Sequence, residues 1–132
     1  MYNGVYTIDQ FAYVHDTLEK WIADKIKGES LGDKLIALGI TKIAIYGANK
    51  FSQMVYTDIK DRVEIVCYID KNAEKYCGHV GQSKVIGLNE LGCINEDTYV
   101  LIVPEFYFGE ILNDLIKQKI DLYRIISLSM VV

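Results

Sequence analysis

The sequence is poor in the residues that build metal sites and disulfide frameworks. Its 132 residues include three cysteines and two histidines, with no C-x-x-C pair, and His15 and His79 lie far apart. An odd number of widely spaced cysteines does not predict a disulfide framework, and the spacing is not that of a zinc site. We therefore expect Cys67, Cys77 and Cys93 to be the reduced thiols of a cytoplasmic protein that binds no metal.

Long apolar runs and clusters of basic residues are also missing. No run of about 18 apolar residues occurs, so we expect no membrane span. The first ten residues, M-Y-N-G-V-Y-T-I-D-Q, lack the basic-then-apolar order of a secretion signal. The net charge is −4, with both signs interspersed. Because phosphate backbones are bound by clustered Lys and Arg, nucleic acid is a disfavoured partner.

The first 40 residues carry a helical pattern. Apolar residues recur at helical spacing from Phe11 to Ile26, with Trp21 among them, and Gly28 is a natural stop. A second, shorter helix is expected over 31–38. We expect residues 1–40 to form a helical lead-in that packs either on the rest of the chain or on a partner chain, and the pattern leaves both options open.

Residues 41–132 alternate short apolar runs with amphipathic segments. The expected main strands are 42–46, 63–69, 98–103 and 123–128, with a short edge strand at 85–86 and helices at 50–60 and 107–118. Strands that alternate with helices indicate a parallel sheet with right-handed crossovers. We therefore predict an α/β domain, a Rossmann-like three-layer parallel sheet of about four to five strands, with the lead-in as an N-terminal helical extension.

The turn after the first strand is the first candidate binding element. It reads G-A-N-K-F-S, whereas the dinucleotide fingerprint is G-x-G-x-x-G/A, so Gly47 is present while Asn49 and Ser52 replace the other two small residues. We expect free amides over residues 47–52 at the start of a helix, aimed at a crevice that would host a phosphate. A tight turn without a ligand is the alternative.

The ends of the other strands supply further candidates. Asp70 follows the second strand, where an acid hydrogen-bonds a ribose hydroxyl in dinucleotide folds, although it is equally placed to close a turn. Lys71 would favour an extra phosphate or screen that acid. Pro104, the only proline, ends the strand over 98–103, and the adjoining Glu105 and Tyr107 are either acid–base partners or a solvated loop.

Several segments together resemble a known domain type. They are I-A-I-Y-G-A-N-K-F, I-V-C-Y-I-D-K-N, C-G-H-V-G-Q-S-K-V-I-G-L-N-E-L, Y-V-L-I-V-P-E-F-Y-F-G-E-I and R-I-I-S-L. Over residues 41–128 they resemble a Rossmann-like domain of bacterial surface-polysaccharide proteins. Similar domains lie beside glycosyltransferases and methyltransferases, form the nucleotide-sugar-binding N-terminal part of sugar acyltransferases, and resemble the first domain of sugar-nucleotide epimerase/dehydratases.

The resemblance implies a bound nucleotide or nucleotide-sugar. The residues that it implies as lining are Gly47, Ala48, Asn49, Phe51, Ser52 and Asp70. The chain has no β-helix repeats for acyl transfer, and the Tyr–Lys dyad of the epimerases is absent from its expected place. No catalytic residue is therefore predicted, and the cofactor is left open, with NAD(P) and a nucleotide-sugar as the two options.

Three functions remain open at this point. The first is a small binding domain that acts with a partner enzyme in carbohydrate biosynthesis. The second is a scaffold or oligomerisation module without a ligand, favoured by Asn49 and Ser52 in place of glycines and by the apolar tail over 125–132. The third is a small NAD(P)-dependent oxidoreductase or transferase. The residues do not distinguish one nucleotide or sugar from another.

Overall fold

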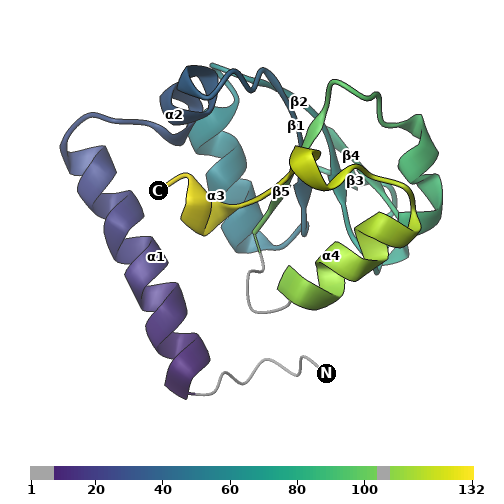
Figure 1. The fold of residues 1–132 in the computed structure, drawn as a ribbon, viewed down its shortest axis with the longest axis horizontal. Coiled ribbons are helices and arrows are strands. Elements are labelled where there is room, and N and C mark those ends of the chain that lie inside the picture. The colour runs from purple at the N-terminus through teal and green to yellow at the C-terminus, as the bar shows by residue number, and fades with distance from the viewer. Residues whose placement is uncertain (1–7, 104–107) are drawn as a thin grey trace.

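The protein is a mixed α/β fold built on a single six-stranded sheet (Figure 1). The computed structural model describes residues 8–103 and 108–132. Its strands are β1 (Lys42–Tyr46), β2 (Glu64–Ile69), β3 (His79–Val80), β4 (Ser83–Ile86), β5 (Tyr99–Ile102) and β6 (Ile125–Ser127). They stand in the order β3-β4-β2-β1-β5-β6, and every neighbouring pair is parallel except β3 with β4. The prediction of a mostly parallel α/β sheet is confirmed, with six strands in place of four or five.

The additional strand is β3, a two-residue antiparallel partner of β4. The chain turns back on itself here because Cys77 and Gly78 have φ of 52° and 86°, and Gly81 has φ of 59°. Two residues are too few to show an alternating pattern in a sequence. The last strand is also shorter than expected, since 3₁₀ turns flank it on both sides, η4 (Leu122–Arg124) and η5 (Leu128–Met130).

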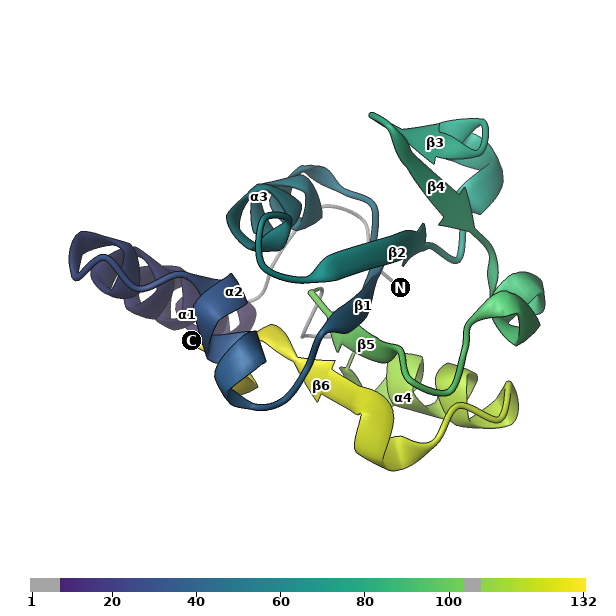
Figure 2. The ribbon, with the colours of Figure 1, turned by 90° about the horizontal axis from the view of Figure 1, so that it is seen from above.

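Helices cover both faces of the sheet (Figure 2). The α-helices are α1 (Ile8–Ile26), α2 (Leu31–Ala37), α3 (Lys50–Ile59) and α4 (Phe108–Lys117), and the 3₁₀ turns η1 (Ala73–Tyr76) and η2 (Leu88–Cys93) follow β2 and β4. Successive side chains of a strand point to opposite faces. Ile43 and Ile45 of β1 therefore belong to the core beneath α3, whereas Ala44 and Tyr46 belong to the core beneath α4.

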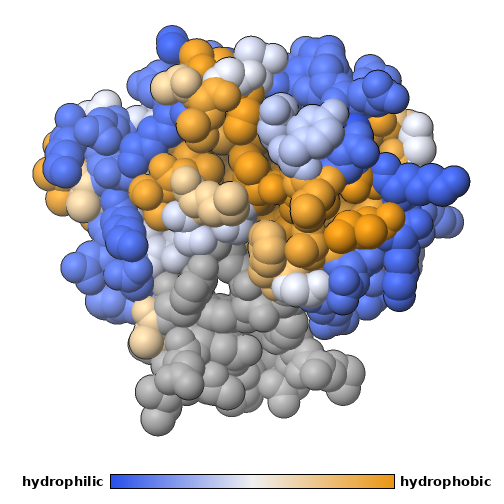
Figure 3. All heavy atoms as spheres, viewed as in Figure 1, coloured by the Kyte–Doolittle hydropathy of each residue, from blue (hydrophilic) through white to orange (hydrophobic). Residues whose placement is uncertain are grey.

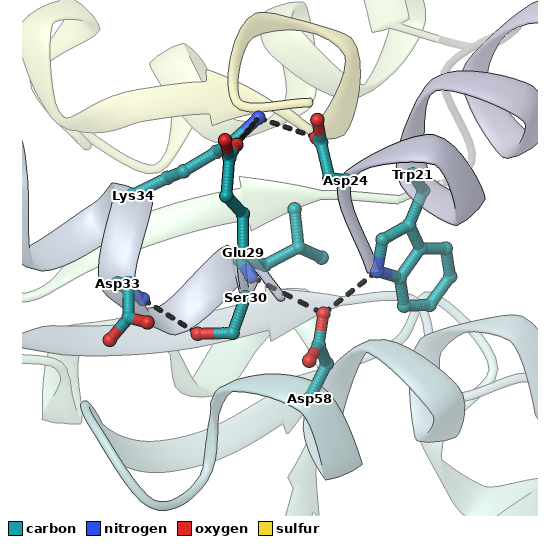
Figure 4. A network of polar contacts seen from close by, with 8 residues as sticks. Trp21, Asp24, Glu29, Ser30, Asp33, Lys34 and Asp58 are labelled. Carbon is teal, nitrogen blue, oxygen red and sulfur yellow. Dashed lines mark hydrogen bonds and ion pairs between the residues drawn. The ribbon is translucent and has the colours of Figure 1, made fainter. Parts of the chain in front are cut away.

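The lead-in helices contact α3. The Trp21 ring stacks on Phe51, with centroids 5.7 Å apart and planes 7° from parallel. The largely buried Asp58 carboxylate accepts a hydrogen bond from Trp21 Nε1 at 2.7 Å (Figure 4). It also accepts from Lys25 Nζ at 2.6 Å and from the Leu31 amide at 3.3 Å. The C-terminal half of α1 and the start of α2 are thus held against α3.

The turn between α1 and α2 has its own polar contacts. Lys34 pairs with Asp24 and, at 3.8 Å, with Glu29, and the Ser30 hydroxyl caps α2 by accepting from the Asp33 amide at 3.0 Å (Figure 4). These contacts hold the end of α1 and the start of α2 together. Within the described residues, no helix combines the length and apolar character needed to cross a bilayer.

Candidate functional site

The order of the strands reverses at β1. From β1 the chain proceeds to β2 and β4 on one side and then crosses to β5 and β6 on the other side. In open parallel sheets, ligands bind outside the carboxyl ends of the strands at such a reversal, because the connections diverge there. The loops after β1, β2, β4 and β5 share this edge, so the site is sought among residues 47–52, 70–74 and 87–90 of the described chain.

Gly47 begins the turn after β1 and adopts φ of 97°, a left-handed conformation that strains any residue with a Cβ. Its amide donates to the Ile69 carbonyl at 2.7 Å. The next amide, of the buried Ala48, donates to Asp70 Oδ2 at 3.0 Å. The end of β2 therefore takes up the first two amides of the turn.

Asn49 is the N-cap of α3. Its side-chain oxygen accepts from the Ser52 amide at 2.9 Å and from the Ser52 hydroxyl at 3.1 Å. This cap explains why Asn49 and Ser52 replace the small residues of the fingerprint. Asn is a preferred N-cap residue, and the fully buried Ser52 donates both its amide and its hydroxyl to the Asn49 side chain. The expectation of free amides throughout residues 47–52 is corrected: those of Gly47, Ala48 and Ser52 are taken by the protein's own acceptors. The Lys50 and Phe51 amides have no acceptor among the described residues.

Phe51 and Asp70 have roles different from those that the strand-end argument assigned to them. The Phe51 ring is half-buried and stacks on Trp21 of α1, so it packs against the lead-in helix. Asp70 accepts from the Ala48 amide through Oδ2 and from the Asn72 amide through Oδ1 at 2.8 Å. Both carboxylate oxygens thus have backbone partners, which is the turn-closing role that the sequence left open for Asp70.

Lys71 lies beside Asp70 and reaches toward α4. Its Nζ is 3.4 Å from Glu110 Oε1 and 3.7 Å from Asp114 Oδ2. Tyr46, at the end of β1, is buried near the same acids. Burial and the neighbouring charges of Asp114, Asp70 and Glu110 raise the pKa of Tyr46 to about 12. Tyr46 therefore stays a neutral phenol at physiological pH.

A pocket of about 540 Å³ opens at the same edge, between the ends of β2 and β4. Its lining residues are Lys71, Ala73, Glu74, Gly78, Val85, Gly87, Leu88, Asn89 and Glu90. Of the residues singled out from the sequence that the structure describes, only Lys71 is among them. Glu90 is held in place because its Oε1 accepts from the Gly87 amide at 3.3 Å. The pocket thus combines an apolar floor with one cation, two acids and an amide.

The strand-end rule would have found this pocket with one more step. Val85 and Ile86 pair in parallel with Tyr68 and Ile69, so β4 has its carboxyl end at the edge used by β2. The sequence predicts only a short edge strand at 85–86, and two residues do not reveal that this strand runs parallel to β2. Pro104, Glu105 and Tyr107 lie outside the described residues. No group of acids, His and Cys suited to a metal ion occurs in 8–103 and 108–132.

Comparison with known proteins gives one assignment. A search of curated proteins found no match. Residues 39–126 match the model of a family described as C2185-like, N-terminal. The match begins after the lead-in helices and includes the turn after β1, Asp70 and the whole pocket. Since it spans more than half of the chain, the protein belongs to the C2185-like, N-terminal family.

Proposed function

We propose that the chain is a small nucleotide- or nucleotide-sugar-binding domain with a Rossmann-like sheet, acting in the cytoplasm with a partner enzyme of carbohydrate or surface-polysaccharide biosynthesis. The observation that carries the proposal is the pocket of about 540 Å³ at the carboxyl ends of β2 and β4. Small-molecule sites are typically about 300–1,000 Å³. When β3 is left out and the other five strands are renumbered in chain order, their order across the sheet is 3-2-1-4-5. The doubly wound order of dinucleotide-binding folds begins in the same way.

In this proposal the two parts of the ligand meet different chemistry. The nucleoside or sugar occupies the pocket, where Val85 and Leu88 offer apolar contact and Asn89 offers an amide for hydrogen bonding. The phosphates point toward the first turn of α3, where the Lys50 and Phe51 amides lack acceptors in the described chain. Gly47, Ala48, Asn49, Ser52 and Asp70 shape the turn that presents these amides. NAD(P) and nucleotide-sugars are the ligand classes that combine these two parts.

The test is binding by calorimetry to a panel of NAD, NADP, UDP, CDP, UDP-sugars and S-adenosylmethionine. Gly87→Val blocks the pocket, because a Cβ at Gly87 lies 3.1 Å from Asn89 Oδ1 and 3.8 Å from the Ala73 Cβ. Gly92→Val is the matched control, since a Cβ there has nothing within 4 Å and Gly92 does not line the pocket. We expect a panel member to bind the wild-type chain and Gly92→Val but not Gly87→Val. No binding at millimolar concentrations would contradict the proposal.

A scaffold or oligomerisation module is the second candidate. It is favoured by the occupied amides of Gly47, Ala48 and Ser52 and by exposed apolar side chains, among them Ile116 at 46% and Met130 at 65% exposure. Apolar side chains gather over α4 and the C-terminal segment on the face shown in Figure 3. Light scattering separates the two candidates. A stable oligomer that responds to no member of the panel would favour the scaffold.

A further inference from the structure

Lys71 is the one cationic side chain among the described residues that line the pocket. The other charged lining residues are Glu74 and Glu90, and the Glu90 carboxylate is already engaged by the Gly87 amide. A ligand group with negative charge therefore has a single favourable partner in this pocket, while acids oppose it elsewhere. Any discrimination between anionic and neutral ligands depends on where the Lys71 ammonium lies.

The Lys71 ammonium has alternative partners outside the pocket. Glu110 and Asp114 are one helical turn apart on α4, neither lines the pocket, and both lie within ion-pair distance of Lys71 Nζ. The distances of 3.4 and 3.7 Å exceed the roughly 2.7–2.9 Å of a strong charge-assisted hydrogen bond. The side chains of Lys71 and Glu110 are 58% and 63% exposed. The exposed Lys71–Glu110 pair is therefore weak, and the ammonium is easily withdrawn from it, whereas the Asp114 side chain is only 22% exposed and its pair with Lys71 is longer.

We propose that Lys71 selects ligands that carry an anionic group at the pocket, such as the phosphate of a nucleoside monophosphate, and that Glu110 and Asp114 compete with that group for the Lys71 ammonium. This inference rests on the proposed nucleotide-binding function. When the pocket is empty, the ammonium pairs with α4. When a phosphate enters, the ammonium turns to it and the two α4 carboxylates are left to solvent. A second anionic group inside the pocket meets the exposed acids Glu74 and Glu90, so any further phosphate is favoured outside the pocket, toward the first turn of α3.

The test compares matched probes that differ only in the phosphate. Uridine and UMP, and adenosine and AMP, are titrated to millimolar concentration while the amide resonances of residues 87–90 are followed by NMR. In the wild-type chain we expect the monophosphate to bind about ten-fold more tightly than the nucleoside, as for one charge-assisted contact. Lys71→Met should abolish this preference without changing nucleoside binding, and Lys71→Arg should restore much of it. Lys84→Met is the control, because Lys84 is an exposed residue of β4 that does not line the pocket.

The competing carboxylates are tested by Glu110→Gln with Asp114→Asn. Because this double variant releases the ammonium, we expect monophosphate binding about two- to five-fold tighter than in the wild-type chain, as for an exposed pair. Nucleoside binding should not change. Equal binding of nucleoside and monophosphate, or an unchanged preference in Lys71→Met, overturns the role of Lys71 while leaving the proposed function standing. No response to any of the four probes, in the wild-type chain or the double variant, also overturns the role of Lys71, and the proposed function falls only if the calorimetric panel fails as well.

Discussion

The Asp70 carboxylate accepts a hydrogen bond from the Ala48 amide at 3.0 Å, and this contact ties the end of β2 to the turn after β1. A carboxylate with two backbone donors is a structural element of the turn, because each amide would otherwise lack a partner. The position that holds a ribose-binding acid in dinucleotide folds therefore shapes the turn here. Any ligand contact by Asp70 adds to this role.

Asp70→Ala should weaken the fold even when no ligand is present. Removing the acceptor leaves the amide of the buried Ala48 unpaired, at a cost of about 1–3 kcal/mol in the free energy of unfolding, whereas water can replace the carboxylate at the exposed Asn72 amide. Urea denaturation followed by circular dichroism measures this loss. Asp61→Ala, which removes the same charge from an exposed position that has no ion pair with any residue the structure describes, is the control. Equal stability of the two variants would contradict the structural role of Asp70.

The sequence predicts the local units well and their pairing less well. The apolar run of β1, the turn at Gly47 and the helix from Lys50 follow from nearest-neighbour signals: a strand covered on both faces, a residue able to adopt positive φ, and an N-cap. The Asp70 contact joins residues 22 apart, and nothing in the spacing distinguishes it from a ribose contact. The same holds for the pocket, which depends on β4 pairing in parallel with β2 through Tyr68 and Val85.

Asp58 should make the attachment of the lead-in depend on pH. Burial opposes ionisation of this carboxyl, but hydrogen bonds from Lys25, Trp21 and the Leu31 amide outweigh it, and its pKa lies below the usual 3.8. A lowered pKa means that the ionised form stabilises the fold above pH 3.8. That contribution is lost as the pH falls through the pKa of the folded state. The stability difference between the wild-type chain and Asp58→Asn should therefore be largest near neutrality and shrink below pH 4.

Trp21 is the only tryptophan, so its fluorescence reports this attachment directly. Urea titrations from pH 2.5 to 7, followed by Trp21 emission, measure the stability of both proteins at each pH. Asp16→Asn is a suitable control, because Asp16 pairs with Lys20 on the exposed surface of α1 itself. A difference between the wild-type chain and Asp58→Asn that stays constant down to pH 2.5 would contradict the ionised contact.

The three cysteines should differ sharply in reactivity. Cys77 and Cys93 are exposed, whereas Cys67 lies on β2 in the core beneath α4. Burial raises the pKa of the Cys67 thiol to about 12, and the thiolate is the reactive form. Iodoacetamide at pH 8 should therefore modify Cys77 and Cys93 in the folded protein, and Cys67 only in denaturant. Peptide mass spectrometry reads out the three sites, and rapid modification of Cys67 in native buffer would contradict the described packing of β2.

Arg124 is a buried cation at the start of β6. Only 4% of the residue is exposed, its Nε donates to the Thr98 carbonyl at 3.0 Å, and its Nη2 has no hydrogen-bond partner in the part of the chain that the structure describes. A buried donor left unpaired costs about 1–3 kcal/mol, which offsets the net contribution of about 1 kcal/mol from the Nε bond. The stabilising part of the side chain is then its buried aliphatic stem.

Two substitutions separate the stem of Arg124 from its charge. Arg124→Met keeps the stem and removes the unpaired donor, so its free energy of unfolding should lie within about 1 kcal/mol of the wild-type value. Arg124→Ala removes the stem as well and leaves a cavity, which should cost about 2–3 kcal/mol. Urea denaturation of both variants at pH 7 measures the difference. If Met proves as damaging as Ala, the guanidinium itself stabilises the start of β6, and the unpaired Nη2 has a partner in solution.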